Sequence, residues 1–111
     1  MKIKQQQVGA VTIVKPQGPI TNSDAEELEL NLKEIIRNTL GRFVLDAAAV
    51  SYVDSKGLES LVNVSQELSR SGKQLKLCNT TETVREVIDI TGLGQQFDQF
   101  EDANSAVRSF L

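Results

Sequence analysis

A short stretch, Asp54-Ser55-Lys56-Gly57, holds the side chains that are best placed for chemistry. Ser55 comes just before apolar residues with helical spacing, so we predict that its side chain is an N-cap, accepting a hydrogen bond from a free N–H group of the first turn. A phosphate on this serine would be tolerated there, because the helix dipole and the free N–H groups favour an anion by roughly 0.3 to 1 kcal/mol. The stretch therefore predicts a helix start that would tolerate a phosphate on its serine.

A second candidate, Asp46, directly follows the apolar run Phe43–Leu45. An aspartate at the end of a buried strand can lie at the carboxyl edge of a sheet and accept a phosphoryl group, as in receiver domains. That chemistry needs Mg²⁺ held by further carboxylates, and the first predicted strands end in Gln, Gly and Pro instead. We therefore expect Asp46 to fix the following loop by accepting backbone N–H groups.

The composition argues against much enzyme chemistry. The chain has no histidine and a single cysteine, Cys78, which removes the usual zinc and copper sites and the His-based nucleophilic triads. We expect no metal, no cofactor and no catalytic activity. Cys78 stands at the end of a predicted strand, and we expect it to be a small buried hydrophobe rather than a reactive thiol.

Charge and length narrow the class of protein further. The formal net charge is -3 and the 12 basic residues are scattered, so the chain shows no electrostatic footprint for a nucleic-acid backbone. No apolar run approaches the roughly 20 residues of a membrane span, and the N-terminal residues lack the apolar core of a signal peptide. We expect a cytoplasmic protein, without a nucleic-acid or membrane partner, that folds as one domain over residues 1–111.

The elements around the candidate site follow from hydrophobic patterning. Phe43–Leu45 is predicted to be the central strand, buried on both faces, and a helix follows it. An N-terminal hairpin of Lys2–Gln6 and Val11–Lys15 is expected to end at Pro16. The helix stripe after the central strand consists of Leu58, Leu61, Val62, Ser65 and Leu68.

The helix before the central strand has a predicted capping box, Ser23 with Glu26, and a stop at Gly41. Its apolar stripe is Ala25, Leu28, Leu32, Ile35 and Ile36, with Leu30 outside it.

The second half of the chain repeats the alternation of strands and helices. We predict a strand at Gln74–Leu77, a helix from Thr81 to the Thr91-Gly92 cap, and a short extended segment at Phe97–Phe100. A last helix from Asp102 is expected to bury Val107, Phe110 and Leu111. The fold class is therefore α/β, a single domain with a mixed sheet of four to five strands and about four helices.

At this point the chain resembles a known family. The pattern Phe-Val-Leu-Asp-x5-Tyr-Val-Asp-Ser-x-Gly-Leu, at Phe43–Leu58, is similar to the signature of STAS domains, and of the bacterial anti-sigma factor antagonists in particular. Gly18-Pro19-Ile20 and Val87–Leu93 resemble further parts of the same family. The resemblance implies that Ser55 is phosphorylated by a partner kinase that is also an anti-sigma factor, and that a serine phosphatase resets it.

The resemblance also implies a docking surface around this serine. We expect a monomer or a weak dimer whose docking residues are Thr21, Asn22, Asp54, Lys56, Gly57, Glu59 and Ser60. Lys56 stands where related antagonists often have a second hydroxyl residue, and Thr21 stands near where they often have an aspartate. The alternative that stays open is a STAS module with another output, or one that binds a small ligand or nucleotide, in which Ser55 is not modified.

Overall fold

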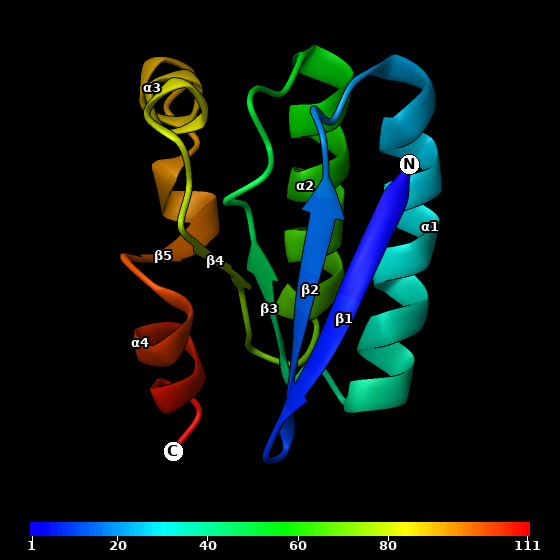
Figure 1. Ribbon diagram of the computed structural model, residues 1–111, viewed down its shortest axis with the longest axis vertical. Helices are drawn as coiled ribbons and strands as arrows, with labels where there is room; N and C mark the ends of the chain where they lie inside the picture. Colours follow the sequence, from blue (N-terminus) through cyan, green and yellow to red (C-terminus); the bar gives the residue numbers. More distant parts are fainter.

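A five-stranded mixed sheet runs through the molecule in the order β1-β2-β3-β4-β5 (Figure 1), so the expected α/β fold class is confirmed. The computed structural model describes residues 1–111. The strands are β1 (Lys2–Val8), β2 (Val11–Gln17), β3 (Phe43–Asp46), β4 (Leu75–Cys78) and β5 (Phe97–Phe100). The helices are α1 (Asn22–Thr39), α2 (Ser55–Ser69), α3 (Glu82–Ile90) and α4 (Ala103–Arg108), with a short 3₁₀ turn at Gly94–Gln96.

The strand β3 is the centre of the sheet, as predicted. All four of its residues are buried, and it pairs in parallel with β2 on one side and β4 on the other. Phe43 and Leu45 point into the large core under α1 and α2, whereas Val44 points to the opposite face under α4. A strand with apolar contacts on both faces needs an unbroken apolar run, which explains the sequence of this segment.

The N-terminal hairpin is longer than predicted. The strands β1 and β2 pair antiparallel across the two-residue loop Gly9-Ala10, and β2 continues through Pro16 instead of ending before it. Pro16 pairs with Ile3, while the parallel pairing of β2 with β3 stops at Val14. The missing N–H group of Pro16 therefore interrupts no ladder, and the strand tolerates it.

The stripe predicted for α1 is confirmed: Ala25, Leu28, Leu32 and Ile35 are buried, Ile36 is partly buried, and Leu30 is exposed. The helix ends one residue before the expected stop, because Leu40 adopts the left-handed conformation at φ 55°. In α2 the stripe includes Val64, which the sequence reading left out, and Val62 lies at its margin.

The C-terminal segment differs most from expectation. The strand β5 is present, but α4 ends at Arg108 and Leu111 is fully exposed rather than buried. Ala106 is the residue of α4 that is fully buried against the sheet. The ammonium group of Lys76 lies 5.3 Å and 4.7 Å from the ring centres of Phe100 and Phe110, which holds the end of the chain against β4.

The helices cover the two faces of the sheet unevenly. Residues of α1, α2 and α3 join the large core on one face, and α4 covers β3, β4 and β5 on the other. None of the helices combines the length and the apolar character that a bilayer crossing requires.

Candidate functional site

The side chain of Asp54 binds the starts of two helices at once. Its Oδ1 accepts a hydrogen bond of 2.7 Å from the N–H of Gly57, which makes it the N-cap of α2, and its Oδ2 accepts one of 3.0 Å from the N–H of Asn22 in α1. Two predictions are thereby wrong. Ser55 is not the N-cap of α2, and Ser23 with Glu26 does not form the cap of α1, whose N-cap residue Thr21 makes no side-chain cap bond.

The physical reason lies in the number of acceptors. A carboxylate has two separate oxygen atoms, and in Asp54 each of them accepts from a different helix start, whereas serine has a single side-chain oxygen. With Asp54 in the cap position, Ser55 becomes the first residue of α2, and it is exposed. The hydroxyl of Ser55 therefore makes no hydrogen bond that stabilises the fold, and the residue is exposed to solvent.

These hydrogen bonds also set the charge of Asp54. The N–H groups of Asn22 and then Gly57 hold the pKa of this carboxyl below its usual value, because they stabilise the ionised form. The residue beside Ser55 is thus an anion at neutral pH.

Gly57 permits a close contact between α2 and the segment after β2. A Cβ atom at this position would lie 2.1 Å from the carbonyl oxygen of Ile20, a backbone atom that is held in place by an isolated bridge to Val53. No side chain fits in that space. The glycine of the Asp-Ser-x-Gly pattern is therefore a packing requirement, which brings Asn22 and Ser55 to the same end of the molecule.

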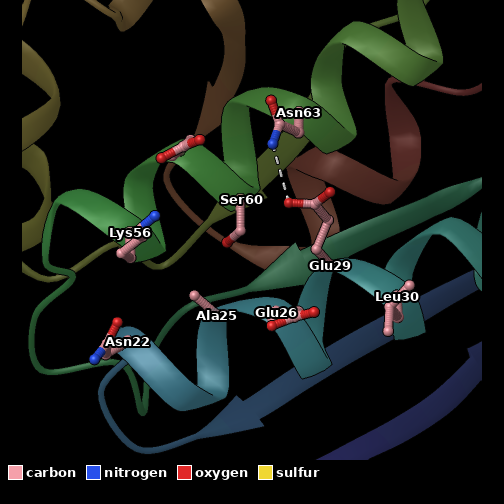
Figure 2. A pocket seen from close by; sticks show the side chains of 9 residues that line it. Asn22, Ala25, Glu26, Glu29, Leu30, Lys56, Ser60 and Asn63 are labelled. Carbon is pink, nitrogen blue, oxygen red and sulfur yellow. Dashed lines mark hydrogen bonds between the residues drawn. The ribbon is translucent and has the colours of Figure 1, made fainter.

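A hollow of about 400 Å³ lies between α1 and α2 and opens beside this site (Figure 2). Glu26 stands on the α1 wall and Glu59 on the α2 wall, and neither has a basic partner within 4 Å. The exposed side chain of Leu30 contributes apolar surface. The lining residues are Asn22, Ala25, Glu26, Glu29, Leu30, Lys56, Glu59, Ser60 and Asn63.

The expected docking residues have different degrees of exposure. Asn22, Lys56 and Glu59 are exposed, whereas Thr21 and Asp54 are partly buried. Gly57 and Ser60 are buried, and the Ser60 hydroxyl donates a hydrogen bond of 2.7 Å to the Gly57 carbonyl. These two residues therefore shape the surface from beneath, and Ser60 does not lie on an exposed helix face as expected.

Sequence reasoning missed the far end of the hollow. The Asn63 side chain donates a hydrogen bond of 3.1 Å to Glu29, which also pairs with Lys33 at 3.0 Å, so the two helices are tied together there (Figure 2). Residues 29 and 63 are far apart in the chain, and no local pattern connects them. In the sequence, the one indication of this part of the hollow was Leu30, an exposed apolar residue outside the helical stripe.

The other candidate, Asp46, fixes the loop after β3 as expected. Its Oδ1 accepts hydrogen bonds from the N–H of Ala48 at 3.0 Å and from the side chain of Asn79 at 3.2 Å, and Lys15 lies 4.0 Å from Oδ2. The carboxylate is buried. No group of three or more potential metal ligands occurs in the structure. The geometry favours the structural role of Asp46 over that of a phosphoryl acceptor.

Cys78 is fully buried at the end of β4, as predicted. Burial, together with the nearby charge of Asp46, raises the pKa of the thiol to about 12. A protonated thiol is a poor nucleophile, so this cysteine belongs to the core.

Comparison with known proteins places this geometry in a family. The model of the STAS domain matches residues 2–106. This chain belongs to the STAS domain family. Among curated proteins it is similar to BtrV of Bordetella bronchiseptica, a candidate anti-sigma factor antagonist. The two are 29% identical over 110 residues, which make up 99% of this chain and 95% of BtrV.

Solved structures show the same STAS fold. TM1081 of Thermotoga maritima, also a candidate anti-sigma factor antagonist, has a TM-score of 0.87 at 21% identity, covering 96% of this chain and 92% of that one. The antagonist SpoIIAA of Bacillus, in its unphosphorylated form, has a TM-score of 0.76 at 18% identity, covering 98% and 96%. Its phosphorylated form has a TM-score of 0.69 at 18% identity, covering 97% and 99%.

Proposed function

We propose that this protein is an anti-sigma factor antagonist that works as a phosphorylation-controlled binding switch. Unphosphorylated, it binds an anti-sigma factor serine kinase and so releases a sigma factor. The kinase phosphorylates Ser55, and a serine phosphatase removes the phosphate. The observation that carries the proposal is the exposed hydroxyl of Ser55 at the first position of α2, next to an aspartate that makes both helix-start bonds.

The fold supports a local switch rather than a refolding event. Because Asp54 and not Ser55 caps α2, adding a phosphate to Ser55 removes no hydrogen bond of the fold. The phosphate would lie at a helix N-terminus, where its charge is favourable. The family relative SpoIIAA is known in both an unphosphorylated and a phosphorylated form, each with this fold.

The effect on a partner is expected to be large. A phosphate adds about -1.5 to -2 charges at pH 7, and an unpaired or like-charge contact in an interface costs several kcal/mol. A hundredfold loss of affinity needs only about 2.8 kcal/mol. The docking surface we propose consists of the exposed residues Asn22, Lys56 and Glu59 and the partly buried Thr21 and Asp54, supported from beneath by Gly57 and Ser60.

The experiment combines mass measurement with binding. The protein is incubated with ATP, Mg²⁺ and a serine kinase encoded beside its gene, and its intact mass is measured. We expect the mass of one phosphoryl group on the wild type and on Ser51→Ala, a control at an exposed serine of the loop before α2, and none on Ser55→Ala. Phosphorylation of Ser55→Ala, or unchanged kinase affinity after modification of Ser55, would refute the switch.

The hollow between α1 and α2 favours a second candidate function, a STAS module that binds a small ligand without phosphorylation. Its volume of about 400 Å³ lies in the range of small-molecule sites. Its lining is mostly polar, however, with Ala25 and Leu30 as the two apolar residues, whereas such sites are predominantly apolar. Titration with GTP and ATP in the absence of kinase tests this candidate, since specific shifts at residues of the hollow in amide NMR spectra would support it.

A further inference from the structure

The edge strand β1 is exposed along most of its length. It is the first strand of the sheet and pairs only with β2, and residues 4 to 8 are all exposed. The helix α1 lies beside the start of this strand (Figure 1), where the amino group of Met1 is 3.7 Å from Asp24 and 3.3 Å from Glu27, and the strand beyond Ile3 is exposed. An open edge presents unpaired backbone groups that another extended chain can bind.

The register shows which backbone groups are free. In antiparallel pairing, residues alternate between pairs whose N–H and C=O groups bond to the neighbour and pairs whose groups point away. The N–H of Thr12 donates to the carbonyl of Arg42, away from β1, so the pair Thr12 and Gln7 is of the second kind. By the same alternation, the backbone groups of Ile3, Gln5 and Gln7 point outward from the sheet edge.

Lysine side chains give this edge a positive charge. Lys2 and Lys4 lie on one face of β1, and Lys4 pairs directly with Lys15 of β2 on that face. No carboxylate lies within 4.0 Å of Lys2 or Lys4, and Lys15 has only Asp46, at 4.0 Å. In a chain with a net charge of -3, this is a local concentration of positive charge in which Lys15 alone has an acidic partner.

We propose that the β1 edge binds an acidic, extended segment of a partner protein as a sixth strand. The backbone groups of Ile3, Gln5 and Gln7 supply the ladder, and carboxylates at alternate positions of the segment lie beside Lys2 and Lys4. This is the β-augmentation mode of peptide recognition. The site is separate from Ser55 and does not depend on the proposed switch.

The charge also selects among possible occupants. If a second copy of this chain paired through its own β1, lysines would be added to a face that already has three. Such like-charge contacts disfavour self-pairing, whereas an acidic segment compensates the same charges. The lysines therefore disfavour pairing with a second copy of this chain and favour binding of an acidic segment.

The test uses a synthetic peptide, N-acetyl-Glu-Thr-Glu-Thr-Glu-Thr-amide, titrated into the isotope-labelled protein and followed by amide NMR. We expect saturable shifts at Ile3, Gln5 and Gln7 that weaken with added salt, and no binding of the matching Lys-Thr peptide. Equal binding of both peptides, or shifts confined to other elements, would overturn the proposal. So would β1-mediated dimerisation of the free protein in sedimentation measurements.

Two variants separate the backbone and charge contributions. Gln5→Pro removes an outward N–H group without breaking a bond to β2, so we expect a folded protein that no longer binds the peptide. The double variant Lys2→Gln, Lys4→Gln tests the charge contribution to peptide binding and leaves the backbone hydrogen-bonding groups intact. We expect it to bind about three- to tenfold more weakly, the effect of losing two exposed ion pairs. Unchanged affinity in this double variant contradicts the proposed charge recognition.

Discussion

At the scale of single residues, the neighbouring residues of the candidate site have different roles: some stabilise the helix starts, and Ser55 is left exposed. Asp54 makes the helix-start bonds to Asn22 and Gly57, and Gly57 leaves room for the carbonyl of Ile20. Ser55, between them in the sequence, is exposed, and its side chain makes no hydrogen bond to the rest of the protein. A residue that carries no structural duty can be modified without destabilising its surroundings, and this makes Ser55 suitable as a switch.

The first residue-scale prediction concerns Asp54→Asn. The amide keeps one acceptor oxygen where the carboxylate has two, so one helix start loses its bond and the urea midpoint at pH 7 is expected to fall. Because the folded-state pKa of Asp54 is lowered, its stabilising effect is present above the unfolded pKa of about 3.9 and is lost as the pH falls through the folded value.

The difference in stability between wild type and Asp54→Asn should therefore narrow below about pH 4. Urea denaturation followed by circular dichroism at a series of pH values measures it. A difference that stays constant down to the lowest pH would show that the carboxylate charge does not matter.

The second residue-scale prediction concerns Gly57→Ala. The added Cβ would meet the Ile20 carbonyl at 2.1 Å, so α2 must shift, and we expect a loss of about 1 to 3 kcal/mol in the free energy of unfolding. Gly94→Ala is the matched control, because nothing lies within 4 Å of its added Cβ. Similar effects of the two substitutions in urea denaturation would argue against the close contact.

At the scale of elements, α2 is the helix that joins the site to the rest of the sheet. Its start is tied to α1 through Asp54, and its middle is tied through Ser65 to β4 and to the 3₁₀ turn that precedes β5. The Ser65 hydroxyl donates to the carbonyl of Gln96 at 2.5 Å and accepts from the N–H of Leu75 at 3.1 Å. A polar residue in an apolar stripe therefore fixes the position of α2 along the sheet.

The element-scale prediction follows from that pair of bonds. Ser65→Ala leaves an acceptor and a donor without partners in a region where Ser65 itself is buried, at an expected cost of about 1 to 3 kcal/mol. Ser69→Ala, at an exposed serine of the same helix, is the control and should change stability by less than about 0.5 kcal/mol. Thermal denaturation of both variants measures the difference. Equal melting temperatures would mean that water replaces the buried hydroxyl.

At the scale of the whole molecule, the helices bury some parts of the sheet and leave other parts exposed. The face that carries Val44 and Cys78 is closed by α4, whose Ala106 belongs to the same buried cluster, whereas β1 is the edge strand of the sheet. Binding surfaces are therefore expected at the Ser55 end and along β1, and not over the centre of the sheet.

The whole-molecule prediction uses the reactivity of Cys78 to report how firmly α4 covers this face of the sheet. With the thiol buried and its pKa raised to about 12, labelling by a disulfide reagent at pH 8 should be roughly a thousandfold slower in the native protein than in denaturing urea. Since Cys78 is the single cysteine, the signal has one source. Rapid labelling under native conditions would show that α4 opens readily.

The sequence by itself determined the order and type of the elements and the position of the candidate site. Apolar runs and helical stripes are local patterns set by burial, so β3, the cores of α1 and α2, and the motif at Asp54 to Gly57 could all be read from them. The family resemblance pointed to the same serine.

Only the tertiary structure decided which residue caps which helix and which surfaces stay open. Asp54 reaches Asn22, 32 residues earlier in the chain, and Glu29 reaches Asn63, 34 residues later, and no local pattern contains such contacts. The strand β2 runs through Pro16 because β3 pairs with it only as far as Val14. A hydrogen bond between distant segments depends on how the chain packs, and packing is a property of the whole fold.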